Sequence, residues 1–202
     1  MKTPFMKIGI IGTHPPGDKL VQSGNRRYGI SGIFPGASAS DSNLHVFPSA
    51  ESLLSVSDVL FIARDASIPY EIAKVAVKES RHLYLESPFS LESGEMEELF
   101  VLCEESRSVL FLDQPLLHHP VYKYYRNALH PGQVVIRVDS ARRYRSLSAM
   151  QYLWFDLSAL LCDVIPSGIR RSSAHIVKDR EDDRIPAAYE VRIDFDNGAQ
   201  AQ

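Results

Sequence analysis

Short apolar segments alternate with helix-like segments along the first 112 residues of the chain. Such alternation is typical of a parallel sheet whose strands are joined by crossover helices. Two of the segments, residues 8–11 and 59–62, are almost continuously apolar, as expected for central strands covered on both faces. The expected strands are residues 7–11, 28–34, 45–47, 58–63, 82–85 and 108–112.

Two helices are expected between these strands. Residues 72–79 have helical spacing, and Pro69 is well placed in the first turn of that helix. Ser90 is a suitable cap for a second helix over residues 91–107, in which apolar residues recur at the spacing of a core-facing helix.

The pattern changes after Pro115, which indicates a domain boundary. We expect a loop over residues 116–120, a short helix over 121–129, a strand over 133–144, a helix over 149–164 and a strand over 170–177. A last strand alternates, with Val191, Ile193 and Phe195 on one face. The Asn-Gly pair at 197–198 predicts a two-residue hairpin turn, so a returning strand should begin at Ala199.

Charge is low and evenly spread, because 22 Lys and Arg against 25 Asp and Glu give a formal net charge of −3. This argues against a nucleic-acid-binding surface. No apolar run reaches the roughly 18 residues that a membrane-spanning helix needs, and no signal-peptide core is evident. We therefore expect a cytoplasmic protein that binds neither nucleic acid nor membrane. Cys103 and Cys162 lie in helix-like segments without other ligands at metal-binding spacing, so we expect buried thiols and no metal site.

Residues 7–17 place a strand before a turn and a helix start, the context of a dinucleotide-binding fingerprint. Gly12 and Gly17 take the first and sixth positions of that fingerprint, but His14 takes the third, where the backbone must approach a pyrophosphate. Pro15 and Pro16 lack the backbone N–H groups that a helix N-terminus directs at a phosphate. Two interpretations stay open: the glycines serve strand–helix packing alone, or they hold a cofactor.

Further segments follow in a familiar order: residues 49–54, 58–63 and 72–77, then 82–91, which contain Glu86-Ser87-Pro88, and 190–199. Together with residues 7–12 they resemble the Gfo/Idh/MocA-type dehydrogenases, whose Glu-Lys-Pro motif is similar to Glu86-Ser87-Pro88. The resemblance implies an α/β fold: a Rossmann-type, doubly wound parallel sheet over residues 1–117, followed by a second α/β domain over 118–202, shorter than the family's. It also implies NAD or NADP as cofactor. The implied cofactor-binding positions are Gly12, Thr13, His14, Gly17, Arg64 and Glu86.

The chain departs from the family at the positions that carry chemistry. The family's Glu-Lys-Pro lysine corresponds to Ser87, which has neither the charge nor the tunable acidity of an ammonium group. In the second domain, the family's Asp, His and Asp on one helix face correspond to Asp156, Leu160 and Asp163. The candidate catalytic positions are therefore Ser87 and Asp156, together with His118 and His119, which follow the last strand of the expected sheet.

Two functions from different classes fit these observations. The first is an oxidoreductase-like protein with degenerate cofactor and catalytic motifs, inactive or weakly nucleotide-binding, which serves as a ligand-binding or regulatory protein. The second is an active NAD(P)-dependent oxidoreductase acting on a sugar-like or other small hydroxyl or carbonyl substrate. Whether the chain is an enzyme stays open at this point. A short sheet with unpaired edges seeks a partner, so we also expect a homo-oligomer.

Overall fold

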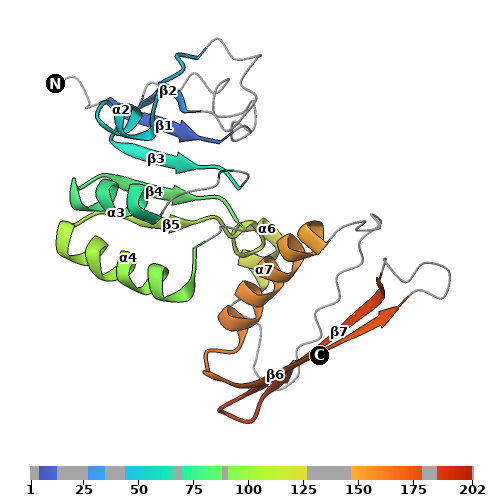
Figure 1. Ribbon diagram of the computed structural model, residues 1–202. Coiled ribbons are helices and arrows are strands. Elements are labelled where there is room, and N and C mark those ends of the chain that lie inside the picture. The colour runs from blue at the N-terminus through green and yellow to red at the C-terminus, as the bar shows by residue number, and fades with distance from the viewer. Residues whose placement is uncertain are drawn as a thin grey trace. The chain divides into compact units, whose positions relative to one another are not determined.

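The computed structural model describes residues 5–12, 27–34, 44–64, 66, 70–87, 91–126, 147–178 and 186–201 (Figure 1). The chain divides into two compact units, Met1–Asp113 (unit 1) and Gln114–Gln202 (unit 2). The sequence pattern placed the division after residue 117, four residues further along the chain.

Unit 1 is built on the expected parallel sheet. Its strands are β1 (Met6–Ile11), β2 (Tyr28–Phe34), β3 (Val59–Ile62), β4 (His82–Leu85) and β5 (Leu110–Leu112). They lie in the order β2-β1-β3-β4-β5, and every neighbouring pair is parallel. The α/β fold class predicted from the sequence is therefore confirmed. The strand expected over residues 45–47 is wrong in extent, because only Val46 pairs, through an isolated bridge to Ile33.

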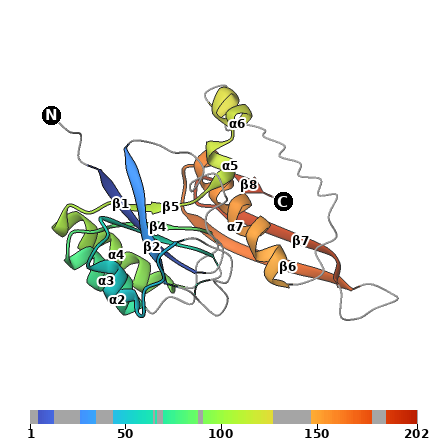
Figure 2. The ribbon, with the colours of Figure 1, turned by 90° about the horizontal axis from the view of Figure 1, so that it is seen from above.

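Three helices of unit 1 lie on the same side of this sheet: α2 (Ala50–Leu54), α3 (Tyr70–Lys78) and α4 (Ser93–Ser106) (Figure 2). The prediction that Ser90 caps the last helix is wrong, because Glu92 occupies the N-cap position. The Glu92 N–H donates to Oε2 of Glu95 at 2.9 Å, which satisfies one backbone donor of the first turn. Arg107 ends the helix in the left-handed conformation, with φ of 57°.

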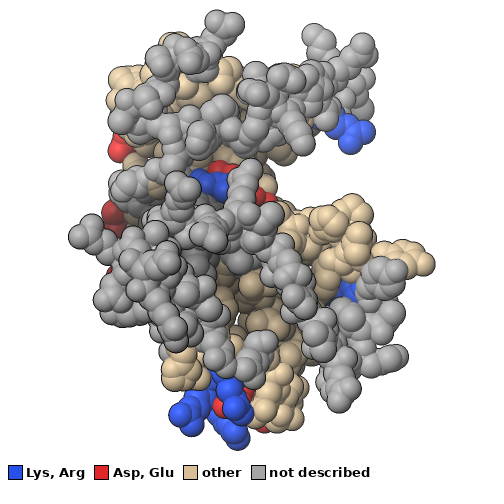
Figure 3. Space-filling model, turned by 90° about the vertical axis from the view of Figure 1, so that its right-hand side faces the viewer, with Lys and Arg blue, Asp and Glu red and all other residues tan. Residues whose placement is uncertain are grey.

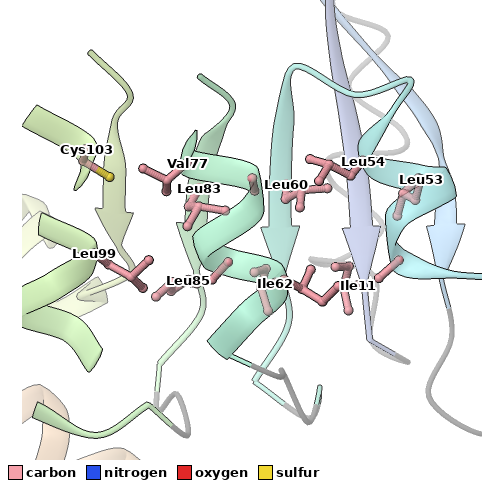
Figure 4. Packing of buried hydrophobic residues seen from close by; sticks show 14 of the residues in the cluster. Ile11, Leu53, Leu54, Leu60, Ile62, Val77, Leu83, Leu85, Leu99 and Cys103 are labelled. Atoms are coloured by element: carbon pink, nitrogen blue, oxygen red, sulfur yellow. The ribbon is translucent and has the colours of Figure 1, made fainter. Parts of the chain in front are cut away.

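The main core of unit 1 lies between these helices and the sheet (Figure 4). Gly9 lies where α2 comes close to β1: a Cβ atom there would be 2.5 Å from Ser57 Oγ and 2.8 Å from Leu53 Cγ. A second, smaller cluster includes Ile10, Ile33 and Phe61. The residues labelled in Figure 4 are Ile11, Leu53, Leu54, Leu60, Ile62, Val77, Leu83, Leu85, Leu99 and Cys103.

Unit 2 contains helices α5 (Pro115–His118), α6 (Pro120–Tyr125) and α7 (Leu147–Val164) and strands β6 (Ile169–Lys178), β7 (Pro186–Phe195) and β8 (Gln200–Ala201). The strands form an antiparallel sheet in the order β6-β7-β8. The expected loop over residues 116–120 is wrong, since Pro115 starts a short helix that continues to His118. The strand expected over residues 133–144 lies outside the described residues.

The hairpin predicted at the end of unit 2 is confirmed, but the two-residue turn is wrong: the Phe195 N–H donates to the Ala199 carbonyl at 2.9 Å, so three residues, Asp196 to Gly198, form the turn. Gly198 adopts φ of 85°, a conformation that favours glycine, and the returning strand pairs with Ile193 and Asp194. Ile193 and Phe195 are buried, as the alternating pattern predicts. The prediction of two buried thiols is half wrong, because Cys103 is buried but Cys162 on α7 is exposed.

None of the helices among the described residues is both long and apolar enough to cross a membrane. No group of three or more His, Cys, Asp or Glu side chains among the same residues is arranged to hold a metal ion.

Candidate functional site

The candidate site of unit 1 lies at the carboxyl ends of β1, β3 and β4. Because β2 adds to one side of β1 and β3 to the other, the ends of β1 and β3 flank a topological switch point. In open α/β sheets, ligands bind in the crevice at such a point. Thr13, His14 and Gly17, which were expected to bind the cofactor, lie outside the described residues.

Gly12 forms the exit from β1. It is buried, its φ of 121° favours glycine, and its N–H donates to the Phe34 carbonyl at 3.1 Å. The first glycine of the fingerprint therefore has a turn geometry that needs glycine. This fits a dinucleotide site, and it equally fits a tight strand exit without a ligand.

Arg64 and Glu86 meet across the ends of β3 and β4. The Arg64 guanidinium forms an ion pair with Oε1 of Glu86, and the Arg64 backbone N–H donates to Oε2 of the same carboxylate at 3.2 Å. The Arg64 side chain is 40% exposed, whereas that of Glu86 is 12% exposed. The structure thus brings together two of the expected cofactor-binding residues, and it leaves the cation accessible.

Ser87 does not present its hydroxyl to a substrate. The residue is 7% exposed, and its hydroxyl donates to the backbone carbonyl of Asp113, which follows β5. The Asp113 N–H in turn donates to the Leu85 carbonyl at 2.8 Å. The hydroxyl proton is therefore used to tie the end of β4 to the end of β5.

Ser87→Ala is expected to lower the free energy of unfolding by about 1–2 kcal/mol, because the carbonyl of half-buried Asp113 loses its donor. Denaturant unfolding monitored by circular dichroism measures the loss. Ser57→Ala is a matched control. The buried Ser57 hydroxyl also donates to a backbone carbonyl, that of Leu53, at 2.8 Å, and it lies away from the site. A Ser87→Ala protein as stable as the parent, beside a weakened Ser57→Ala protein, would contradict the tether.

Sequence reasoning missed Tyr84, which lies on β4 between two other aromatic rings. Its ring stacks on Phe61 at 4.7 Å and on Phe111 at 5.0 Å, because the three residues are paired across β3, β4 and β5. Burial raises the pKa of Tyr84, and the charge of Asp113, a hydrogen bond to Asp113 and the charge of Glu86 raise it further. A phenol that keeps its proton so firmly is unsuited to act as a general base near neutral pH.

His118 and His119, the two histidines proposed as catalytic positions, are both exposed. His118 ends α5, and His119 caps α6, where its Nδ1 accepts the Val121 N–H at 3.3 Å. Such a cap satisfies one of the free donors of a helix start. Among the described residues, neither histidine belongs to a metal-binding group.

Helix α7 carries Asp156 and Leu160, two of the positions singled out in the sequence. Asp156 is half-buried on α7. Leu160 is 7% exposed and lines a small apolar pocket, together with Trp154, Leu157 and Ile193. Leu160 therefore belongs to the apolar packing between α7 and the antiparallel sheet.

Asp163 on α7 holds α6. Its Oδ2 accepts a hydrogen bond from the Tyr122 hydroxyl, and its Oδ1 lies 2.5 Å from Nη2 of Arg126. The Asp163 side chain is 20% exposed. Burial, followed by the hydrogen bond and charge of Asp163, raises the pKa of Tyr122 to about 12. Asp163 therefore joins α7 to α6 and its C-cap through these two contacts.

Asp163→Asn is expected to lower the pKa of Tyr122 toward its ordinary value of 10.0, because the neighbouring negative charge is removed while burial remains. NMR titration of ring-labelled tyrosine measures it. Since the pKa is raised on folding, the stabilising contribution of protonated Tyr122 is complete below pH 10 and is lost as pH rises toward 12. Asp194→Asn, which alters the Arg192 pair on β7, is the control and should leave the Tyr122 titration unchanged.

Comparison with known proteins places this geometry in context. No family model matches the chain. A curated relative, UDP-N-acetylglucosamine 3-dehydrogenase of Acidithiobacillus ferrooxidans, is 24% identical in an alignment 190 residues long that covers 88% of this chain and 61% of that protein. The chain therefore spans less than two thirds of the length of this relative.

Solved structures agree on the fold. The same dehydrogenase of Acidithiobacillus ferrooxidans gives a TM-score of 0.75 at 22% identity, over 98% of this chain and 66% of that one. GenD2 from gentamicin A biosynthesis, in complex with NAD, gives 0.74 at 15% identity, over 99% and 65% of the two chains. Biliverdin reductase from Synechocystis sp. PCC 6803, in complex with biliverdin and NADP+, gives 0.68 at 18% identity, over 97% and 70%.

The chain shares the fold of these three proteins. A Rossmann-type unit is followed by a second α/β unit, as the sequence pattern predicts. The identities lie below 25%, so they carry the fold, and the role of each side chain must come from the contacts above.

Proposed function

We propose that the chain is an oxidoreductase-like protein of the Gfo/Idh/MocA type that binds a small phosphate-bearing ligand at the carboxyl edge of its parallel sheet but does not transfer hydride efficiently. Its role is then that of a ligand-binding or regulatory protein. The observation that carries this proposal is the Ser87 hydroxyl, which is buried and donates to the Asp113 carbonyl.

Two further observations support the loss of chemistry. Leu160 replaces a histidine and lies in apolar packing, and Asp163 is engaged by Tyr122 and Arg126. Proton transfer in a dehydrogenase needs a group near the reacting oxygen that can gain or lose a proton close to neutral pH. None of the described residues at the positions equivalent to the family's lysine and histidine supplies one.

The described residues fit a dinucleotide in part. Gly12 has a turn geometry that lets a ligand approach the backbone, and Arg64 provides a cation at the same edge. Bound NAD or NADP would supply a hydride acceptor in its oxidised form and a hydride donor in its reduced form. The retained features are thus those of binding, and the altered features are those of proton transfer.

The second candidate is an active NAD(P)-dependent oxidoreductase acting on a sugar-like substrate. It is favoured by the similarity to UDP-N-acetylglucosamine 3-dehydrogenase, which extends over 88% of the chain. On that hypothesis Ser87, Asp156 and His118 or His119 take over the proton transfer that the family assigns to its lysine and histidine.

Titration with NADH and NADPH by calorimetry, followed by a hydride-transfer assay with UDP-N-acetylglucosamine and either oxidised cofactor, separates the two candidates. The first predicts binding weaker than micromolar and no absorbance of reduced cofactor above background. Micromolar binding together with turnover would overturn it and establish the second. The assay should use the longest natural form of the chain.

A further inference from the structure

We propose that Arg64 is the residue that binds the phosphate-bearing part of the ligand, and that Glu86 is an internal counter-ion which this ligand must displace. The ligand class is a pyrophosphate, free or within a dinucleotide. The inference rests on the proposed function, because it assumes that the carboxyl edge of the sheet binds a ligand.

Arg64 lies at the carboxyl end of β3, next to the end of β1. Ile11 of β1 pairs with Ile62 of β3, and the Ala63 N–H donates to the Ile11 carbonyl at 2.8 Å. Ala63 therefore follows β3 where Gly12 follows β1, and Arg64 is the next residue after Ala63. Gly12 and Arg64 thus lie on the two sides of the topological switch point, where ligands of open α/β sheets bind.

The charges at the strand ends of unit 1 also single out Arg64. Among the described residues that lie one or two positions after a strand of unit 1, Arg64 is the only basic one, while Glu86 and Asp113 follow β4 and β5. Figure 3 looks onto the carboxyl ends of these strands and shows basic and acidic side chains next to one another there. An anion at this edge is attracted by one cation and repelled by its carboxylate partner.

The geometry of the Arg64–Glu86 ion pair allows a phosphate to replace the carboxylate. A guanidinium presents a planar fork of N–H donors that suits two phosphate oxygens as well as a carboxylate. Oε2 of Glu86 is held by the Arg64 backbone N–H at 3.2 Å, a bond that does not involve the guanidinium. A phosphate can therefore take over the 40% exposed guanidinium while Glu86 keeps its backbone contact. Glu86 then weakens binding through competition and repulsion.

The two roles of Glu86 predict opposite signs. If Glu86 only stabilises the strand ends, Glu86→Gln leaves ligand affinity unchanged or lowers it. If Glu86 is a counter-ion to be displaced, Glu86→Gln raises the affinity for pyrophosphate about tenfold, since removing a charge next to a charged hydrogen bond changes binding by about 1.4 kcal/mol or more. Arg64→Gln lowers the affinity by at least a similar factor, and Arg64→Lys falls between Arg64→Gln and the parent.

The experiment titrates inorganic pyrophosphate, ADP, NADH and adenosine into the full chain by calorimetry, at fixed salt, with circular dichroism to verify folding. Glu98→Gln is the matched control, because Glu98 pairs with Lys74 at 2.7 Å between α3 and α4, away from the strand ends. We expect Glu86→Gln to strengthen the binding of pyrophosphate, ADP and NADH, and Glu98→Gln to change nothing. Adenosine, which lacks phosphate, should respond to neither variant.

Each other outcome has a defined meaning. If the parent chain binds the phosphate-bearing probes and the Arg64 and Glu86 variants bind them equally well, the inference fails and the proposed function stands. If neither the parent nor Glu86→Gln binds any probe, both fail. Weaker pyrophosphate binding by Glu86→Gln overturns the inference as well. Should Glu86→Gln not fold, the ranking of the parent, Arg64→Lys and Arg64→Gln decides, and equal affinities overturn the inference.

Discussion

Leu60→Ala is expected to lower the free energy of unfolding of unit 1 by about 2–5 kcal/mol, a large part of the stability of an ordinary domain. Leu60 lies at the centre of β3, is fully buried and pairs with Gly9 of β1 and Leu83 of β4. Truncation leaves a cavity between the sheet and the helices that the paired strands are unable to close. Hydrogen exchange of the β1, β3 and β4 amides measures the effect within unit 1.

Val59→Ala provides the control for this substitution. Val59 is the neighbour of Leu60 on β3, is half-buried and points to the other face of the sheet. Its truncation removes less buried surface and should cost clearly less. Equal losses for the two variants would mean that the core between sheet and helices does not carry the stability assigned to it.

Phe195→Ala is expected to destabilise unit 2 by about 3–5 kcal/mol. Phe195 ends β7 and is 0% exposed, and its N–H donates to the Ala199 carbonyl at 2.9 Å across the hairpin. The chain has one tryptophan, Trp154, which lies on α7 and lines the pocket next to Ile193. Tryptophan fluorescence during urea unfolding therefore reports on this unit.

Arg192→Ala is the matched control for Phe195→Ala. Arg192 is an exposed residue on the same strand, so its truncation should leave the fluorescence midpoint almost unchanged. A Phe195→Ala protein with the midpoint of the parent would contradict the placement of this ring in the core of unit 2.

The parallel sheet could be predicted from the sequence because its central strands are apolar on both faces. Residues 8–11 and 59–62 appear as continuous apolar runs, and they pair with each other in the structure. The hairpin of unit 2 was equally accessible, since the Asn-Gly pair and the alternation before it are local signals. Periodicity and turn chemistry are properties of neighbouring residues, so they survive without tertiary information.

The short helices of unit 2 were harder to predict. Pro115 and Pro120 each take a first-turn position of a short helix. We interpreted residues 116–120, which include most of α5, as a loop, whereas the helix expected over residues 121–129 corresponds to α6. Proline is compatible with both, because it lacks only the N–H that a first turn leaves without an intrahelical partner. Tertiary packing decides between the two at this length.

The contacts of the candidate site depend on register between strands, and this is why the sequence did not reveal them. Ser87 was recognised as an altered position, but its partner, the Asp113 carbonyl, lies 26 residues away. The pairing of Arg64 with Glu86 spans 22 residues and requires β3 and β4 to be adjacent and parallel. The stack of Phe61, Tyr84 and Phe111 carries one available signal: each aromatic lies near the end of an apolar run.

The two cysteines give the molecule a built-in chemical reporter. Cys103 belongs to unit 1, where burial raises the pKa of its thiol, and Cys162 belongs to unit 2, where it is exposed. An alkylating reagent should therefore modify Cys162 in the native protein, but reach Cys103 only when α4 leaves the sheet. The rate at which the second label appears measures the opening of unit 1 in an otherwise untreated chain, without any substitution or denaturant.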